Sequence, residues 1–147
     1  SRLSGGYRTF LTIDGQAGRP DLEATRHRAA IHENGGLGVQ LLGIGVNGHV
    51  GFNEPGCEPD SRCRVTELAK STIERNGYAP GTRAVTLGIA EITSAQRIIM
   101  VATGAAKSPA IAAMIEGSQS TGYPASLLRG HPDLALFLDR AAANDLS

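Results

Sequence analysis

Ile98-Ile99-Met100-Val101-Ala102 is followed directly by Thr103-Gly104 and then by residues 105–117. The first five residues are uniformly apolar, as in the central strands of parallel sheets, which are buried on both faces. Thr103-Gly104 is typical of a turn. In the third part small and apolar residues recur at helical spacing, namely Ala106, Ala110, Ala113 and Met114. Pro109 lies near the first turn, where proline is tolerated. The stretch therefore predicts a strand, a glycine turn and a helix.

Further segments on either side extend this alternation. Short β-prone or apolar runs predict strands at 10–13, 38–45, 84–89 and 134–138. A helix is expected from Asp21, which would cap it, to Gly35-Gly36, which would close it, with Leu22, Thr25 and Ala29 on one face. A short terminal helix is expected at 141–146. Strands alternating with helices predict an α/β fold, a parallel sheet with helices on both faces, in one domain over residues 1–147.

Composition limits the classes of partner. The chain has 147 residues, of which 41% are hydrophobic, 19% charged and 4% aromatic, and its 14 Lys and Arg balance its 14 Asp and Glu. No broad positive field exists to hold a nucleic acid or an anionic membrane, so a small molecule is the expected partner. No apolar run could span a bilayer, and we expect a cytoplasmic protein. Cys57 and Cys63 predict neither a disulfide scaffold nor a metal site.

The sequence 42–56 carries the chemistry. In parallel sheets ligands bind beyond the carboxyl ends of the strands, which places a site at the loops after Gly45 and after Gly104. The first of these loops contains His49, flanked by Asn47 and Glu54, which is the arrangement of a proton shuttle with polar groups to fix its tautomer. The alternative is a loop histidine bonded to a carbonyl, with Glu54 simply solvated.

The amino-acid sequence of this loop favours the proton shuttle. Leu42-Gly43-Ile44-Gly45-Val46-Asn47-Gly48-His49-Val50-Gly51-Phe52-Asn53-Glu54-Pro55-Gly56 closely resembles the signature of glucosamine-6-phosphate deaminases. The resemblance covers nearly all of the chain from Ile13 onward. Its further matching segments are 61–65, 84–89, 103–107, 115–117, 123–128 and 131–132.

The resemblance implies a Rossmann-like enzyme that converts glucosamine 6-phosphate and water to fructose 6-phosphate and ammonia, without metal or organic cofactor. It implies that His49 moves the proton that opens the pyranose ring, and that Glu54 and Asn47 orient and tune its imidazole. Position 47 is Asp in many members, so Asn47 keeps the orienting role but supplies no charge to hold His49 protonated. Gly43 and Gly45 would lie under the sugar, where a side chain would collide with it.

The resemblance also implies anion-binding residues. Lys107 matches the lysine that contacts the substrate phosphate, at the start of a helix. Arg64 falls on an arginine that binds an allosteric phosphate in some members, but Thr66 and Glu67 replace the basic character expected beside it. Tyr78 stands about where many members have a second phosphate-binding arginine, and Arg83 is not an obvious substitute.

Two parts of the family's site lie upstream of the matching region and are not in this sequence: the Asp that removes the proton at C2, and the Gly-Gly-Ser/Thr-Pro type loop that holds the phosphate. We therefore expect a C-terminal part of such an enzyme, incomplete at the N-terminus and lacking the first strands of the sheet. A central strand would then become an exposed edge. The chain alone is expected to be poorly active and marginally soluble.

Two other functions stay open. A 6-phosphogluconolactonase shares the fold and a Gly-His loop, but that loop usually continues toward Thr-Ala-Ser-Leu-Phe-Pro, so Phe52-Asn53-Glu54-Pro55 tells against it. A non-catalytic module that senses sugar phosphates would need the pocket but not the base. A homo-oligomer is compatible with the sequence, which does not define the oligomeric state.

Overall fold

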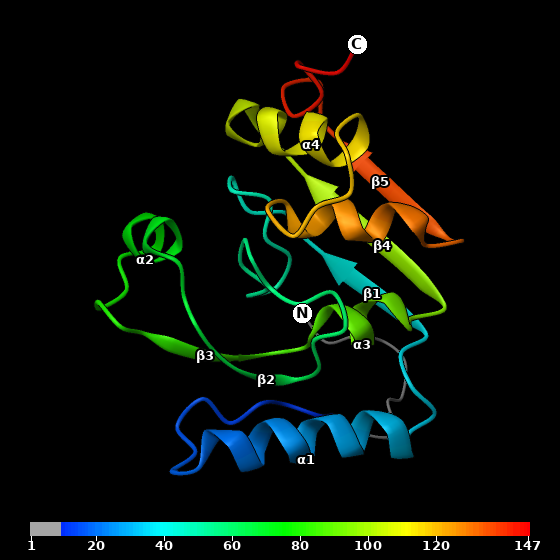
Figure 1. Cartoon of the computed structure of the whole chain (residues 1–147). Helices are drawn as coiled ribbons and strands as arrows, with labels where there is room; N and C mark the ends of the chain where they lie inside the picture. The colour runs from blue at the N-terminus through cyan, green and yellow to red at the C-terminus, as the bar shows by residue number, and fades with distance from the viewer. Residues whose placement is uncertain (1–9) are drawn as a thin grey trace.

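A three-stranded parallel sheet organises the computed structural model, which describes residues 10–147. Its strands are β1 (Val39–Leu42), β4 (Arg97–Ala102) and β5 (Leu134–Leu138), in the order β1-β4-β5 (Figure 1). Leu42 pairs with Met100, and Met100 with Leu136. The expected parallel sheet is confirmed, with the apolar run 98–102 as its central strand.

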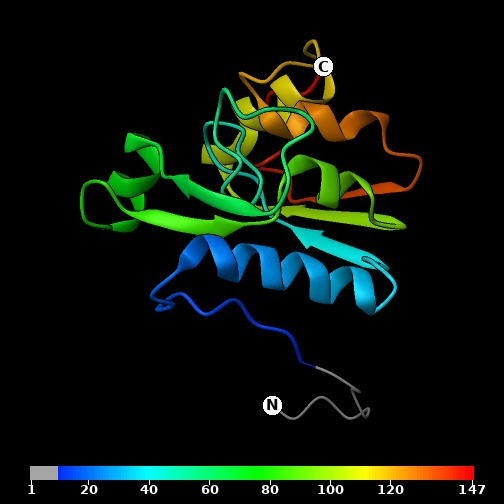
Figure 2. The same cartoon turned by 60° about the horizontal axis from the view of Figure 1, so that its bottom comes forward.

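One face of this sheet carries the core. Ile98, Met100 and Ala102 alternate along β4 and are buried on that face. The α-helices α3 (Ile89–Thr93) and α4 (Ser108–Ile115) and the 3₁₀ helix η2 (Pro124–Gly130) supply the side chains that pack against them, and Figure 2 shows these helices together on one side of the strands. Each fully buried Ile, Leu or Met contributes about 1.5–3 kcal/mol of transfer free energy, so these helices are held mainly by the sheet.

The opposite face of the sheet is exposed in the described part of the chain. Val39 and Leu41 on β1 are 60% and 66% exposed, and Val101 and Phe137 lie on the same face at 43% and 58%. The strand expected to be buried at 38–45 is therefore half exposed, because β1 is an edge strand with its even-numbered residues inward and its odd-numbered ones outward. The helices expected on both faces cover one face of the three described strands.

A second, antiparallel sheet stands beside the first. It consists of β2 (Arg64–Glu67) and β3 (Arg83–Thr86), and the helix α2 (Lys70–Asn76) lies between them in sequence. The sequence predicted parallel strands only, so this antiparallel pair was not expected. The strand expected at 84–89 ends at Thr86, because Gly88 and Ile89 begin α3.

The first helix, α1 (Pro20–Glu33), packs against β2 and β3. It begins with Pro20 at its first position and has no side-chain cap, so the expected cap at Asp21 is wrong. Its buried residues are Glu23 and Ala24, whereas Leu22 is 52% exposed. The expected apolar face was wrong because the Glu23 carboxylate is anchored by three polar contacts: the Arg26 guanidinium and the Asp14 backbone N–H donate to it.

The ends of the chain differ from expectation as well. Residues 10–13 form no strand, and residues 140–145 form turns in place of the helix expected at 141–146. The strand, glycine turn and helix expected from residue 98 onward are confirmed: Gly104 has a φ of +87°, η1 (Ala105–Lys107) follows, and α4 continues from it. The Gly104 N–H donates to the Asp139 carboxylate at the end of β5, which fixes this turn.

In the described part of the chain no helix is both long and apolar enough to cross a membrane.

Candidate active site

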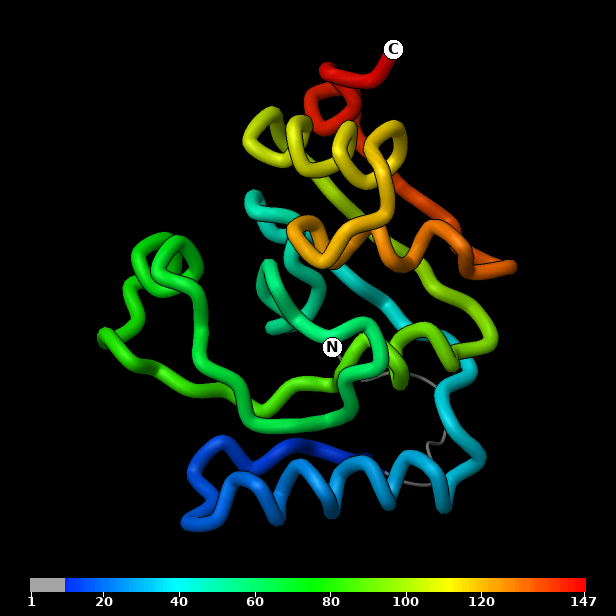
Figure 3. The backbone as a smooth tube through the Cα atoms, viewed as in Figure 1, coloured from blue at the N-terminus to red at the C-terminus, as the bar shows by residue number. Residues whose placement is uncertain are grey.

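The carboxyl ends of β1 and β4 open into one pocket of about 310 Å³. The two loops meet there, because the Lys107 ammonium donates a hydrogen bond to the Ile44 carbonyl. The helix α2 forms the facing wall, and Figure 3 traces the chain after β1 running between α2 and α4. The pocket is lined by Gly43, Ile44, Gly45, Val46, Asn47, His49, Gly51, Ser71, Thr72, Arg75, Asn76 and Lys107. The predicted position of the site, at the loops after Gly45 and Gly104, is where this pocket lies.

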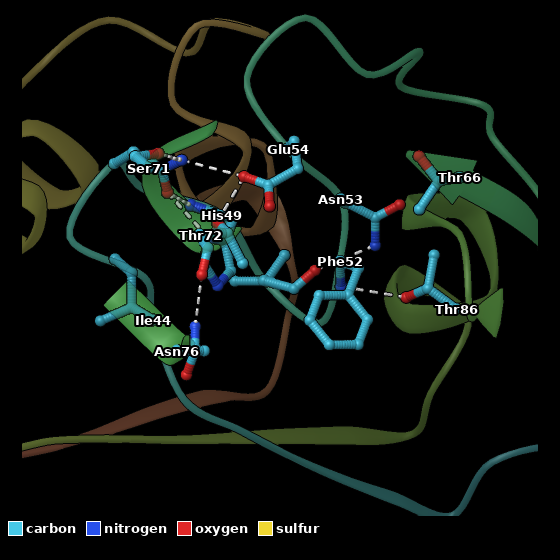
Figure 4. A network of polar contacts seen from close by, with 12 residues as sticks. Ile44, His49, Phe52, Asn53, Glu54, Thr66, Ser71, Thr72, Asn76 and Thr86 are labelled. Carbon is cyan, nitrogen blue, oxygen red and sulfur yellow. Dashed lines mark hydrogen bonds and ion pairs between the residues drawn. The ribbon is translucent and has the colours of Figure 1, made fainter. Parts of the chain in front are cut away.

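Three oxygen atoms surround Nδ1 of His49. Asn47 Oδ1 lies at 2.7 Å, Glu54 Oε2 at 3.3 Å and Thr72 Oγ1 at 3.4 Å. Figure 4 shows His49 with Glu54 and Thr72 close to it. An amide oxygen and a carboxylate oxygen only accept hydrogen bonds, so we assign the proton of the neutral ring to Nδ1. Nε2, which has no protein partner within residues 10–147, then carries the free lone pair of an imidazole that lines the pocket.

The Asn47 amide joins the imidazole to the carboxylate. Its Nδ2 donates to Glu54 Oε2 at 2.9 Å and to Ser71 Oγ at 3.2 Å, while its Oδ1 accepts from the His49 backbone N–H at 3.2 Å. This orientation satisfies both ends of the amide. An aspartate in the same place would set a second carboxylate against Glu54, so this network suits the neutral side chain.

Burial lowers the pKa of His49, because removing the ring from water penalises its charged form. The negative charge of Glu54 opposes this effect, and the positive charge of Lys107 adds to it. The direction of the shift keeps His49 neutral at pH 7. A neutral ring with a free Nε2 can accept a proton from a bound molecule and return it to a neighbouring atom.

Hydrogen bonds of the neighbouring Asn53 fix the loop that carries Glu54. Asn53 is fully buried, and its Nδ2 donates to the carbonyls of Val50 and Leu87. Arg64 donates from Nη1 to Asn53 Oδ1 at 2.9 Å, so in this structure its guanidinium contacts the loop that carries Glu54. Glu54 is itself buried, and its Oε1 has no hydrogen-bond partner in the described residues. An allosteric role for Arg64 stays a prediction.

The two glycines expected under the sugar have different surroundings. A Cβ on Gly45 would lie 2.3 Å from Nδ1 and Cε1 of the His49 ring, so the imidazole packs directly on the bare backbone. Gly43 also lines the pocket, and a Cβ on it would meet nothing closer than the Val101 carbonyl oxygen at 3.9 Å. Gly45 is thus required by the position of His49, and the expected contact of both glycines with sugar stays a prediction.

Lys107 lies at the end of η1, immediately before α4. Burial lowers the pKa of its ammonium group, and the positive charge of Arg75 lowers it further. Since an ammonium group at pH 7 remains charged unless its pKa falls far, Lys107 presents a cation to the pocket.

The contribution of α2 could not be found by sequence reasoning. Ser71, Thr72, Arg75 and Asn76 line the pocket, whereas Tyr78, at the position resembling an anion-binding arginine, does not. The left-handed Gly77, with a φ of +68°, ends the helix before Tyr78. The only available signal was the polar pair Thr72 and Asn76 at i, i+4 spacing, which is common on solvated helices. No cluster of three or more His, Cys, Asp or Glu side chains that could hold a metal ion exists in residues 10–147.

Comparison with known proteins gives a consistent assignment. The chain is 42% identical over 142 residues to a glucosamine-6-phosphate deaminase of Bacillus velezensis, and 44% identical over 125 residues to one of Rhodopirellula baltica. The matches cover 92% and 81% of this chain but 58% and 50% of those proteins, so the chain spans about half the length of the curated relatives it matches.

Solved structures agree with the sequence relatives. A monomeric glucosamine-6-phosphate deaminase superposes with a TM-score of 0.85 at 37% identity, over 90% of this chain and 58% of that chain. The 6-phosphogluconolactonase of Trypanosoma brucei superposes with a TM-score of 0.69 at 21% identity, over 91% of this chain and 57% of that one, which is a likeness of fold alone. The family model of glucosamine-6-phosphate isomerases/6-phosphogluconolactonase matches residues 3–136. The chain therefore belongs to the family of glucosamine-6-phosphate isomerases and 6-phosphogluconolactonases.

Proposed function

We propose that this chain carries the ring-opening part of a glucosamine-6-phosphate deaminase site. The observation that supports the proposal most directly is the environment of His49: Nδ1 is held by Asn47 and Glu54, while the ring lines the pocket with no protein partner for Nε2 in the described residues. The overall reaction would convert glucosamine 6-phosphate and water to fructose 6-phosphate and ammonia.

In the proposed first step, Nε2 of His49 accepts the proton of the anomeric hydroxyl. The carbonyl bond then forms at the anomeric carbon as its bond to the ring oxygen breaks, and the imidazolium returns the same proton to that oxygen. No proton or electron is gained or lost. Glu54 Oε2, 3.3 Å from Nδ1, stabilises the positive charge that the ring carries between the two transfers. Asn47 keeps the imidazole in the tautomer that this step needs.

The other end of the substrate would be bound by Lys107. Its ammonium group lines the pocket and is close enough to His49 for its charge to lower the histidine's pKa. A phosphate there would bring the sugar ring toward the imidazole. Positioning of this kind raises the reaction rate by several orders of magnitude, because the reacting groups no longer have to meet in the right orientation by diffusion. The later proton transfer at C2 and the release of ammonia require a base that we do not assign among the pocket residues.

The proposal favours the deaminase over the lactonase, the other activity in the family's description. Asn47, His49 and Glu54 form one hydrogen-bonded network, and Phe52-Asn53-Glu54-Pro55 is the part of the loop in which the sequence differs from the lactonase pattern. A sensor of sugar phosphates would bind the same ligand without opening its ring. The deaminase and the lactonase therefore predict different reactions in this pocket, and the sensor predicts binding without a reaction.

The step assigned to His49 can be measured without the rest of the reaction. Ring opening and closure interconverts the α and β anomers of glucosamine 6-phosphate, and exchange spectroscopy by NMR measures the rate. We expect the chain to accelerate this exchange, and His49→Ala to reduce the acceleration by about 10²- to 10⁴-fold, the usual worth of a positioned acid–base group. His32→Ala, an exposed histidine on α1, is the matched control and should exchange at the wild-type rate.

Two parallel assays separate the alternatives. A coupled assay for fructose 6-phosphate tests whether the whole deamination proceeds, and hydrolysis of 6-phosphogluconolactone tests the lactonase. Faster lactone hydrolysis than anomer exchange would replace our proposal by the lactonase. Binding of glucosamine 6-phosphate with no effect on anomer exchange would favour the sensor. Equal exchange rates for wild type and His49→Ala would remove His49 from the mechanism.

A further inference from the structure

Arg75 is a cation in the pocket whose role neither the sequence resemblance nor the comparisons assign. It lies in the last turn of α2, on the wall facing the loops after β1 and β4, and it lines the same pocket as His49 and Lys107. Arg75 is exposed and makes no ion pair or hydrogen bond with any residue in the described chain. Its guanidinium, with five donors in a planar fork, is therefore free to bind a ligand.

Arg75 and Lys107 come from segments far apart in sequence and approach each other across the pocket. The positive charge of Arg75 contributes to lowering the pKa of Lys107, and that of Lys107 contributes to lowering the pKa of His49. Lys107 thus lies within electrostatic reach of both Arg75 and His49. None of the residues that line the pocket is acidic. Glu54, the nearby carboxylate, is buried and is already engaged by His49 and Asn47.

Two like charges that face each other without a counter-charge cost free energy, and the cost disappears when an anion sits between them. A phosphate monoester fits this position best, because its two negative charges match two cations and its oxygen atoms accept bidentate hydrogen bonds from a guanidinium. Lys107 alone offers a point charge, whereas the planar guanidinium of Arg75 adds hydrogen bonds with a fixed direction.

We propose that Arg75 is a substrate-binding residue, which with Lys107 forms a two-cation site for the phosphate of a sugar phosphate and orients the sugar ring toward His49. The assignment rests on the proposed function for the identity of the sugar, but the two-cation site itself is a property of the pocket. Tyr78 does not line this pocket, and the left-handed Gly77 ends α2 before it.

The test compares Arg75→Gln with the wild-type chain and with Arg83→Gln, an exposed arginine on β3 that does not line this pocket. Calorimetry measures the affinity for inorganic phosphate, glucosamine 6-phosphate and unphosphorylated glucosamine. We expect Arg75→Gln to weaken binding of both phosphate-bearing ligands by about ten- to a hundredfold, the worth of charge-assisted hydrogen bonds, and to reduce the salt dependence of binding. Glucosamine should bind equally to both proteins.

Arg75→Lys serves as a second variant, which keeps the charge but not the fork. It should recover part of the affinity, whereas loss of helix α2 would affect both substitutions equally and would show in the circular dichroism spectrum. An unchanged phosphate affinity in Arg75→Gln, with Lys107→Gln weakened, would overturn the assignment of Arg75 and leave the proposed function standing. Failure of the wild-type chain to bind inorganic phosphate would also overturn it.

The reverse outcome separates the two proposals. If wild type binds inorganic phosphate in an Arg75-dependent manner but does not accelerate anomer exchange of glucosamine 6-phosphate, the two-cation site stands and the proposed deaminase step fails. If Arg75→Gln weakens phosphate binding and also raises the concentration of glucosamine 6-phosphate needed for half-maximal exchange, both stand.

Discussion

Asn47 sets the charge that His49 experiences. Its amide offers a dipole to Nδ1 at 2.7 Å, where an aspartate would offer a full negative charge. Burial lowers the pKa of the imidazole, and Glu54 alone opposes that effect with a negative charge. The structure thus has a histidine that stays neutral to lower pH than an ordinary one, which extends the acidic side of its working range.

Replacing the Asn47 amide by a carboxylate should shift the pKa of His49 in the opposite direction. Asn47→Asp brings a negative charge to Nδ1 and stabilises the imidazolium, so the pKa of His49 rises. Because the proposed step needs neutral His49, the acid limb of the anomer-exchange rate should move to higher pH, and the variant should be slower than wild type below pH 7. The rate is measured from pH 5 to 8.

The control for this change is Gln119→Glu, which makes the same conversion of amide to carboxylate on an exposed loop. It should leave the acid limb in place. An acid limb that stays in place, or moves to lower pH, in Asn47→Asp would contradict the assignment of Nδ1 as the hydrogen-bonded, protonated nitrogen.

Among the elements, α1 depends on one ionised side chain. The Arg26 guanidinium, and next the Asp14 backbone N–H, lower the pKa of Glu23 from 4.5 to about 2. These contacts join the helix to the loop before it. A carboxylate whose pKa is lowered by folding stabilises the folded state above the unfolded pKa, and this contribution is lost as the pH falls through the folded value.

Glu23→Gln should therefore lower the melting temperature at pH 7, where the wild-type contribution is complete. The difference from wild type should shrink as the pH falls from 4.5 through about 2, and disappear once the Glu23 carboxyl group is protonated in the folded protein as well. Thermal melting followed by circular dichroism at several pH values measures this. Glu33→Gln, at the exposed end of the same helix, should change the melting temperature little. A difference that stays constant with pH would show that Glu23 acts by packing and not by charge.

At the scale of the whole molecule, one face of the three-stranded sheet is uncovered within residues 10–147. Val39, Leu41, Val101 and Phe137 are exposed on this face across β1, β4 and β5, and β1 has a paired strand along only one of its edges in the described chain. Apolar patches of this kind and open strand edges promote association. This surface favours the low solubility expected from the sequence, which stays a prediction.

We expect the 147-residue chain to self-associate through this face. Leu41→Lys with Phe137→Lys places two charges on it without touching the opposite, buried face, and should lower light scattering at equal protein concentration while the circular dichroism spectrum is retained. Gln16→Lys with Gln119→Lys adds the same charge at exposed polar positions and should reduce scattering less. Equal effects of the two pairs would assign the association to net charge and not to the apolar face.

The parallel sheet, its central strand, the strand-turn-helix unit and the pocket at the strand ends followed from the sequence, because each rests on local chemistry. Uniform apolarity at 98–102, glycine at 104 and helical spacing after it act between near neighbours in the chain. His49, Asn47 and Glu54 also lie within eight residues of one another, so one loop can bring them together.

Long-range packing decided the rest. Residues 70–76 have no helical pattern of apolar residues, and α2 exists as part of the pocket wall because β2 and β3 carry it there. Glu23 is buried and Leu22 exposed because Arg26 and the Asp14 N–H compensate the carboxylate, which no hydrophobic pattern records. Arg75 meets Lys107 across 32 positions of sequence for the same reason: a charge contributes to a site through distance in space, and only the folded chain sets that distance.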